Sequence, residues 1–216
     1  MSLPITNTNI HSPASSILTT VQLIPKEVLF SLSVSAMITA GGAVRFNLPS
    51  SISSVPITLH TLAAVLGGMI FGSDIGVYGA VIHLMFFFWR YHSKLNSTSS
   101  SGNRIRNILQ SMPSLGYIIG MIPCAHIAGY HYRNPCFVPQ KVGSIAVTAA
   151  MAQGVTVLCG VSWLYFAFPE QSIGTLVRRN VFPFIPGLIV KSLLAGIAVC
   201  YFRGLCNIEF LVRKKM

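Results

Sequence analysis

The stretch "VFPFIPGLIVKSLLAGIAVCYF", Val181 to Phe202, decides the class of fold that this chain adopts. It is apolar over about 20 residues, the length that an α-helix needs to cross the hydrocarbon core of a bilayer. Lys191 lies near its middle, and Pro183, Pro186 and Gly187 come before it. Because each proline disfavours helical geometry in the residue before it, we expect an irregular elbow that becomes helical near Gly187.

The whole chain shares this apolar character. Of its 216 residues, 52% are hydrophobic and 9% are charged, and the mean hydropathy is +0.66. Soluble domains carry about 25% charged residues, so this chain has too few charges to cover a surface in water. The net charge of +11 comes from basic residues scattered at the ends of apolar segments. That placement is typical of membrane flanks, and we predict that the protein contacts the lipid bilayer and no nucleic acid.

Apolar runs predict an all-α integral membrane bundle of six transmembrane helices. We expect these helices over residues 27–44, 57–71, 75–89, 113–132, 142–168 and 181–202. The expected division is a polar N-terminal tail over 1–26, the bundle over 27–204 and a short basic tail over 205–216. An even number of spans places both termini on one side. The Lys and Arg counts of the two sides are equal, so charge alone does not orient the bundle.

Lys191 is the strongest single sign of function. An ammonium at the centre of a spanning helix costs about 3 kcal/mol. The side chain either snorkels to lipid headgroups or faces a ligand carboxylate inside the bundle.

Two other helix entries resemble the one before Lys191. "SSVPITLHTL" (53–62) brings Thr58, His60 and Thr61 behind a proline, and "MPSLGYIIG" (112–120) brings Ser114, Gly116 and Tyr117. With six alternating spans, all three entries fall on one membrane side. This predicts the walls of one binding site, although proline is also common at ordinary helix starts.

Catalytic and metal-binding patterns are absent from the sequence. Its four acidic residues lie at segment ends, and no nucleophile, zinc or phosphate-loop motif occurs. We therefore predict no enzyme activity, no metal and no cofactor. An alternative is a membrane enzyme or proton-coupled carrier that uses His60, His83 and His126, and it requires these side chains to converge. Otherwise, His83 and His126 are expected to form hydrogen bonds between helices.

Small side chains recur on the first predicted helix at Ser31, Ser35 and Thr39. Such a face lets helices approach closely in lipid. Its partner is either a neighbouring helix of the same chain or a separate membrane subunit.

These motifs resemble the BioY family, the biotin-capturing membrane subunits of energy-coupling-factor (ECF) transporters. The similarity lies in "VPITLHTLAAVLGGMIFGSDIGVYGAVIHL", "MPSLGYIIG", "VFPFIPGLIVKSLLAG" and "AGGAVRFNLP", and it spans roughly residues 28 to 200. The resemblance implies a six-helix subunit in a bacterial inner membrane, with both termini cytoplasmic and biotin entering from outside. It also implies a membrane scaffold and two ATPases as partners, docking partly through Ser31, Ser35 and Thr39 or their neighbours.

Residue by residue, the resemblance assigns the biotin carboxylate to Lys191. The remaining predicted biotin-binding residues are Leu188, Tyr117, Gly116, Ser114, Thr58, His60, Thr61 and, in the outer loop "SSSGNRIRN", Asn103. The family keeps an aspartate where this chain has Leu188, and commonly a glutamine where it has His60. Another small anionic vitamin is therefore the alternative ligand, and a homo-oligomeric state is left open.

Overall fold

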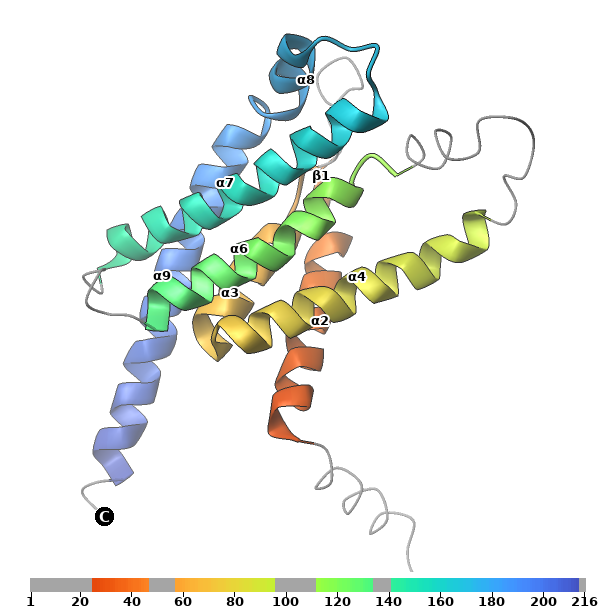
Figure 1. The fold of residues 1–216 in the computed structure, drawn as a ribbon. Helices are drawn as coiled ribbons and strands as arrows, with labels where there is room; N and C mark the ends of the chain where they lie inside the picture. The colour runs from red at the N-terminus through yellow and green to blue at the C-terminus, as the bar shows by residue number, and fades with distance from the viewer. Residues whose placement is uncertain (1–24, 47–56, 96–111, 134–140, 214–216) are drawn as a thin grey trace, which may run out of the picture.

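Over the residues that the structure describes, the protein is an all-α bundle with one very short pair of strands (Figure 1). The computed structural model describes residues 25–46, 57–95, 112–133 and 141–213. Their elements are α2 (Lys26–Ala43), β1 (Arg45–Phe46), β2 (Ile57–Thr58), α3 (His60–Phe71), α4 (Ser73–Leu95), α6 (Leu115–Arg133), α7 (Val142–Ala167), α8 (Ile173–Asn180) and α9 (Phe184–Arg213).

Six of the helices, α2, α3, α4, α6, α7 and α9, correspond to the six predicted spans. The start of α2 and the end of α9 lie at one end of the bundle, and the short helix α8 lies at the other (Figure 1). We predicted that an even number of passes brings the start of the first helix and the end of the last helix to the same side. This prediction is confirmed for the described helices.

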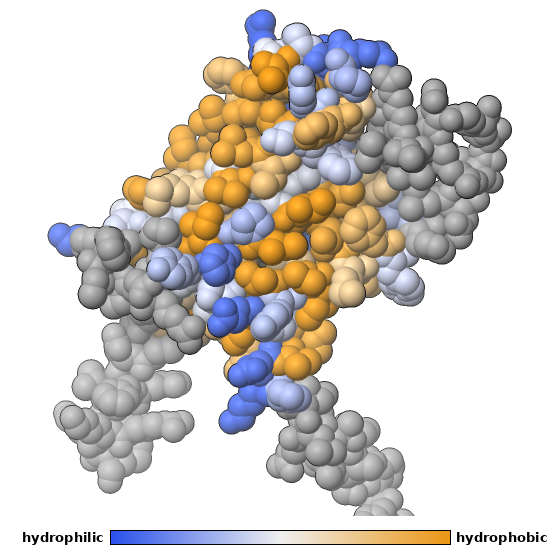
Figure 2. Space-filling view, viewed as in Figure 1, coloured by the Kyte–Doolittle hydropathy of each residue, from blue (hydrophilic) through white to orange (hydrophobic). Residues whose placement is uncertain are grey.

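The outer surface of the bundle is apolar. Large side chains such as Trp89 and Phe166 are 72% and 74% exposed, and Leu158 and Tyr201 are similarly uncovered. Hydrophobic residues cover most of the visible body, and strongly hydrophilic residues lie mainly toward its two ends (Figure 2). Lipid is the solvent in which such a surface is stable, so this is a membrane protein.

Two of the described helices also have the length and hydropathy of a membrane span. Within the described residues, Val142–Ala167 and Phe184–Phe202 are long and apolar enough to cross a membrane, with 26 and 19 residues and mean hydropathies of 1.7 and 1.9. His60–Phe71 and Leu115–Tyr130 are shorter apolar helices.

Glycines bring the helices into backbone contact at the end away from α8. A Cβ atom on Gly68 of α3 would overlap the carbonyl oxygen of Ala125 on α6, and one on Gly129 would overlap the backbone of Ser73. Such close approaches replace the hydrophobic effect as a source of stability in lipid. They fix α3, α4 and α6 relative to one another.

Two predicted helix starts are corrected by the structure. Helix α3 begins at His60, not at Ile57, because Ile57–Thr58 pairs antiparallel with Arg45–Phe46, placing Arg45 opposite Thr58. Helix α9 begins at Phe184, not near Gly187, so the irregular elbow is confined to the turn at residues 181–183. Pro186 fits because first-turn residues have no intrahelical partner for their N–H groups.

Helix α8 is an element that we did not predict. The Ser172 hydroxyl caps it by accepting a hydrogen bond of 3.3 Å from the Thr175 N–H. Leu176 and Asn180 turn inward from it and are buried. At the other end of the chain, α9 continues to Arg213, inside the segment predicted as a basic tail, and most of the predicted N-terminal tail lies outside the described residues.

Candidate functional site

A cavity of about 1460 Å³ lies among the helices of the bundle, and residues near the starts of α3, α6 and α9 line it. Helices α2 and α4 form one wall, and α3, α6, α7 and α9 supply the others. Its lining includes residues from all three predicted entries: Thr58, His60, Thr61, Ser114, Tyr117, Leu188 and Lys191. The structure thus brings together side chains that are as far as 133 residues apart in sequence, between Thr58 and Lys191.

Lys191 points into the bundle. Its side chain is 7% exposed, and Nζ donates hydrogen bonds to Thr61 Oγ1 at 2.8 Å and to the Thr58 carbonyl oxygen at 3.4 Å. Both acceptors are uncharged, and no aspartate or glutamate is among the described residues that line the cavity. This geometry excludes snorkelling to headgroups in the described conformation, and it leaves a buried cation without a counter-ion.

A buried chain of amide and hydroxyl groups fixes the surroundings of Lys191. The Thr61 hydroxyl donates to Gln153 Oε1 at 3.2 Å, and Gln153 Nε2 donates to Ser192 Oγ at 3.0 Å. Gln153 lies on α7 and Ser192 on α9, so the chain joins three helices. We did not predict Gln153 as a site residue, although a lone amide within the apolar run 142–168 is a signal that could have identified it.

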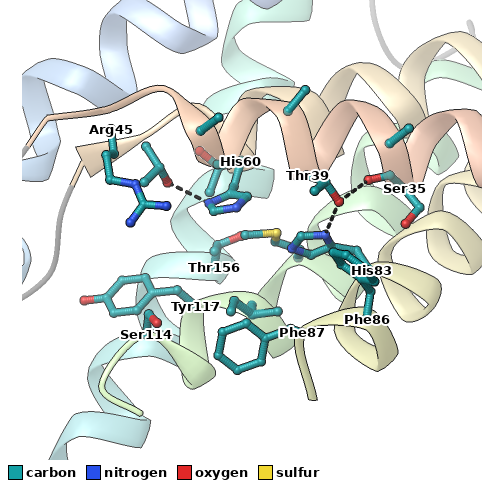
Figure 3. Close-up of a pocket in the computed structure, with 18 of the residues that line it drawn as sticks. Ser35, Thr39, Arg45, His60, His83, Phe86, Phe87, Ser114, Tyr117 and Thr156 are labelled. Atoms are coloured by element: carbon teal, nitrogen blue, oxygen red, sulfur yellow. Dashed lines mark hydrogen bonds between the residues drawn. The ribbon is translucent and has the colours of Figure 1, made fainter. Parts of the chain in front are cut away.

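A second polar group lies where α2, α3 and α4 meet. His60 Nδ1 lies 3.0 Å from Thr58 Oγ1, and the ring centroids of His60 and His83 are 5.3 Å apart. His83 Nδ1 lies 3.0 Å from Thr39 Oγ1 on α2 (Figure 3). The prediction that His83 forms a hydrogen bond between helices is confirmed.

Besides Lys191 and Arg90, Arg45 brings a further cation to the cavity lining, and it lies near His60 (Figure 3). The pairing of β1 with β2 holds its backbone opposite Thr58. Sequence reasoning counted Arg45 only among the basic residues of the segment ends. The strand pair that turns it into a lining residue is too short to recognise by alternation of apolar and polar residues.

Tyr117 forms an aromatic wall beneath α8. Its ring stacks on Phe184 with centroids 5.8 Å apart, and its hydroxyl donates to the Asn180 carbonyl oxygen at 3.2 Å. Leu164 and Leu176 pack around it. Ser114, one turn earlier, also lines the cavity.

Two predicted ligand residues are not among those lining the cavity. Gly116 faces α7, where a Cβ atom would overlap Trp163 and lie 2.8 Å from the Cys159 carbonyl oxygen, so it serves helix packing. Asn103 lies outside the described residues.

The burial of the small residues on α2 bears on which partner packs against them. Ser31 is 2% exposed and Ser35 is buried, while Thr39 contacts His83 and lines the cavity. A face turned toward α4 and the cavity is not free to dock a separate subunit. The structure favours a neighbouring helix of the same chain as the partner of Ser31 and Ser35, and docking of a separate subunit through α2 stays a prediction.

The three histidines of the alternative function do not converge. His60 and His83 are neighbours, but His126 is exposed on α6 and stacks on Tyr130 of the same helix at 6.2 Å. Among the described residues, no group of three or more His, Cys, Asp or Glu side chains is arranged to hold a metal ion. The arrangement suits binding: cations, hydroxyls and aromatic rings surround one cavity.

Comparison with known proteins agrees with this architecture. The sequence model of the BioY family matches residues 12–89 and 102–207. The chain belongs to the BioY family.

Its fold is similar to that in the crystal structure of an S-component for biotin from an ECF-type ABC transporter. The TM-score is 0.64 at 19% sequence identity, over 89% of this chain and 94% of that chain. This BioY protein therefore has the six-helix membrane fold of such S-components. A search among curated proteins gave no matching sequence.

Proposed function

We propose that the protein captures biotin from outside the cell, as the substrate-binding subunit of an importer. The observation that carries the proposal is Lys191, a buried ammonium whose partners are neutral oxygens. A ligand carboxylate supplies the negative charge that the described lining of the cavity lacks. Membership of the BioY family and the likeness to a biotin S-component support biotin as the ligand.

The cavity offers complementary surfaces to the other parts of such a ligand. Lys191 binds the carboxylate by a charge-assisted hydrogen bond, and Arg45 draws the anion inward. Leu188 and Phe184 line the path of the alkyl chain, and the Tyr117 ring covers it. The protein's role in this proposal is capture and release, with no bond made or broken.

Energy for release comes from partner subunits in this proposal, a membrane scaffold and two ATPases of an ECF module. The exposed side of α2 that does not line the cavity carries Leu29, Ser33 and Met37, and it is the face we assign to docking, since Ser31 and Ser35 are buried. With both termini cytoplasmic in a bacterial inner membrane, the cavity at the opposite end faces outward.

A second ligand class is favoured by the size of the cavity. At about 1460 Å³ it exceeds the roughly 300–1,000 Å³ of ordinary ligand pockets, so a larger anionic vitamin also fits. A panel of labelled vitamins offered to the purified protein separates this ligand from biotin.

The central test is biotin binding to protein in lipid nanodiscs, measured by titration calorimetry. We expect Lys191→Met to weaken biotin binding about 10- to 100-fold, the loss of one charge-assisted hydrogen bond. The variant should fold, because methionine matches the stem of lysine and removes a buried charge. Lys141→Met, at an exposed lysine before α7, is the matched control and should bind as the wild type does.

Unchanged affinity in Lys191→Met would overturn the assignment of Lys191. A wild-type protein that binds another vitamin and not biotin would move the function to the second ligand class. Biotin uptake in biotin-requiring cells, with and without the coupling subunits, tests the need for ATPase partners.

A further inference from the structure

His83 has one ring nitrogen with a partner and one without. Nδ1 lies 3.0 Å from Thr39 Oγ1, whereas Nε2 is buried and has no hydrogen-bond partner among the described residues. The side chain is 5% exposed, and its ring belongs to the wall of the cavity. Buried polar atoms without partners are rare in native proteins, so this one needs a physical explanation.

The hydrogen bonds of Thr39 determine which nitrogen carries the proton. Its single hydroxyl proton is donated to the Ser35 carbonyl oxygen at 2.9 Å. Thr39 Oγ1 is then an acceptor toward His83, so Nδ1 carries the hydrogen and Nε2 of the neutral ring has a bare lone pair. The opposite arrangement would leave a buried N–H without an acceptor, which is rarer than an under-used acceptor.

We propose that His83 Nε2 accepts a hydrogen bond from an N–H group of the bound ligand, the ureido N–H in the case of biotin. The inference rests on the proposed function and adds to it a residue that binds the end of the ligand opposite the carboxylate. Thr39 is a positioning residue: by accepting from Nδ1, it keeps Nε2 free. Nε2 is covered by neighbouring side chains, so the ligand reaches it after a small rotation of the ring or of its neighbours.

The polar side chains of the cavity form a strip with opposite character at its two ends. Lys191 donates to the Thr58 carbonyl oxygen, and the Thr58 hydroxyl contacts His60. The His60 ring in turn contacts His83. One end thus offers an unpaired cation and the other a bare acceptor. A ligand with a carboxylate at one end and N–H groups at the other matches both.

Asparagine at position 83 provides the sharpest test. The His83→Asn side chain can still donate toward Thr39 from the position of Nδ1, but it has no atom at the position of Nε2. We expect biotin affinity to fall about 10-fold or more, the effect of leaving one buried hydrogen bond unmade. His126→Asn, the same substitution at an exposed histidine outside the cavity, should bind biotin as the wild type does.

Analogues distinguish a hydrogen bond from a general disturbance of the cavity. Biotin methylated at one or the other ureido nitrogen lacks one N–H donor. The wild type should reject one of these two analogues by about 10-fold or more relative to biotin, and His83→Asn should lose that discrimination. A His83→Asn protein that still discriminates between biotin and both analogues would overturn the inference.

Nitrogen-15 spectra of histidine-labelled protein test the tautomer directly. We expect a hydrogen on Nδ1 and none on Nε2 for the His83 signal, which is assigned by its loss in His83→Asn. On adding biotin, the Nε2 resonance should shift, and Thr39→Val should weaken the tautomeric preference. A hydrogen on Nε2 would overturn the inference while leaving the proposed function intact. A wild-type protein that binds no biotin would overturn both.

Discussion

The two ends of the bundle are built from the same helices but are packed by different means. Away from α8, glycines bring backbones into contact, as Gly68 does against Ala125 and Gly129 against Ser73. Toward α8, the helices are joined by long polar side chains, such as Lys191 and Gln153. The ligand cavity lies where such polar contacts are added to glycine contacts like that of Gly116 against α7. Stability and binding should therefore respond to different substitutions.

The largest expected effect lies in the close-packed end. Gly68→Val puts side-chain atoms into the carbonyl oxygen of Ala125, a backbone group that cannot move aside. We expect a loss of about 3 kcal/mol or more in the free energy of unfolding. Gly154→Val on α7 is the matched control, since nothing lies within 4 Å of a Cβ there. Thermal unfolding of both variants in nanodiscs measures the difference, and equal melting temperatures would remove the distinction between the two ends.

A smaller loss is expected where the polar network joins three helices. Gln153→Leu retains the volume of the side chain but leaves the Thr61 hydroxyl and Ser192 Oγ without their amide partner. We expect about 2 kcal/mol lower stability, because two buried hydroxyl groups lose their hydrogen-bond partner. Thr148→Val is the control, since that buried hydroxyl bonds only within its own helix, to the Ser144 carbonyl oxygen. Equal unfolding curves for the two variants would contradict the prediction.

A substitution at the cavity end should change binding more than stability. A Cβ atom on Gly42 would overlap the ring of His60, which is a side chain able to move. Gly42→Ala should thus fold normally but displace the middle of the polar strip, with a loss of about 10-fold in biotin affinity. In Gly143→Ala the new Cβ meets open space, and affinity should not change. Titration calorimetry compares the two, and a stability loss without a binding loss in Gly42→Ala would reverse the expected pattern.

The smallest effect concerns the unliganded state. Thr61→Val removes the acceptor 2.8 Å from Lys191 Nζ. We expect the protein without ligand to lose about 1 kcal/mol, and the protein with biotin to lose less because the carboxylate then satisfies Lys191. The rise in melting temperature on adding biotin should therefore be greater than in the wild type. An identical rise would show that Thr61 and the ligand do not share Lys191.

Much of the architecture could be predicted from the sequence because lipid leaves few choices. Apolar runs about 20 residues long can satisfy their backbone groups only as helices, so the six spans follow from composition. Their ends were predicted less well, since the strand pair at Arg45 and Thr58 involves only two residues from each segment. Helix α8 was missed because it is short and polar on one side, although Ser172 is a recognisable N-terminal cap.

The features of the candidate site likewise fall into those that the sequence shows and those that only the tertiary structure shows. The sequence by itself determined that Lys191 lies near the middle of a membrane helix, since the run Val181–Phe202 has the length and hydropathy of a span. Tertiary structure alone decided that Lys191 faces Thr61 and not lipid, and that Gln153 supports it. It also decided that Gly116 and Ser31 serve packing. The physical reason is that hydropathy reports how deep a residue lies in the bilayer, whereas the direction that its side chain takes depends on how neighbouring helices are rotated and packed.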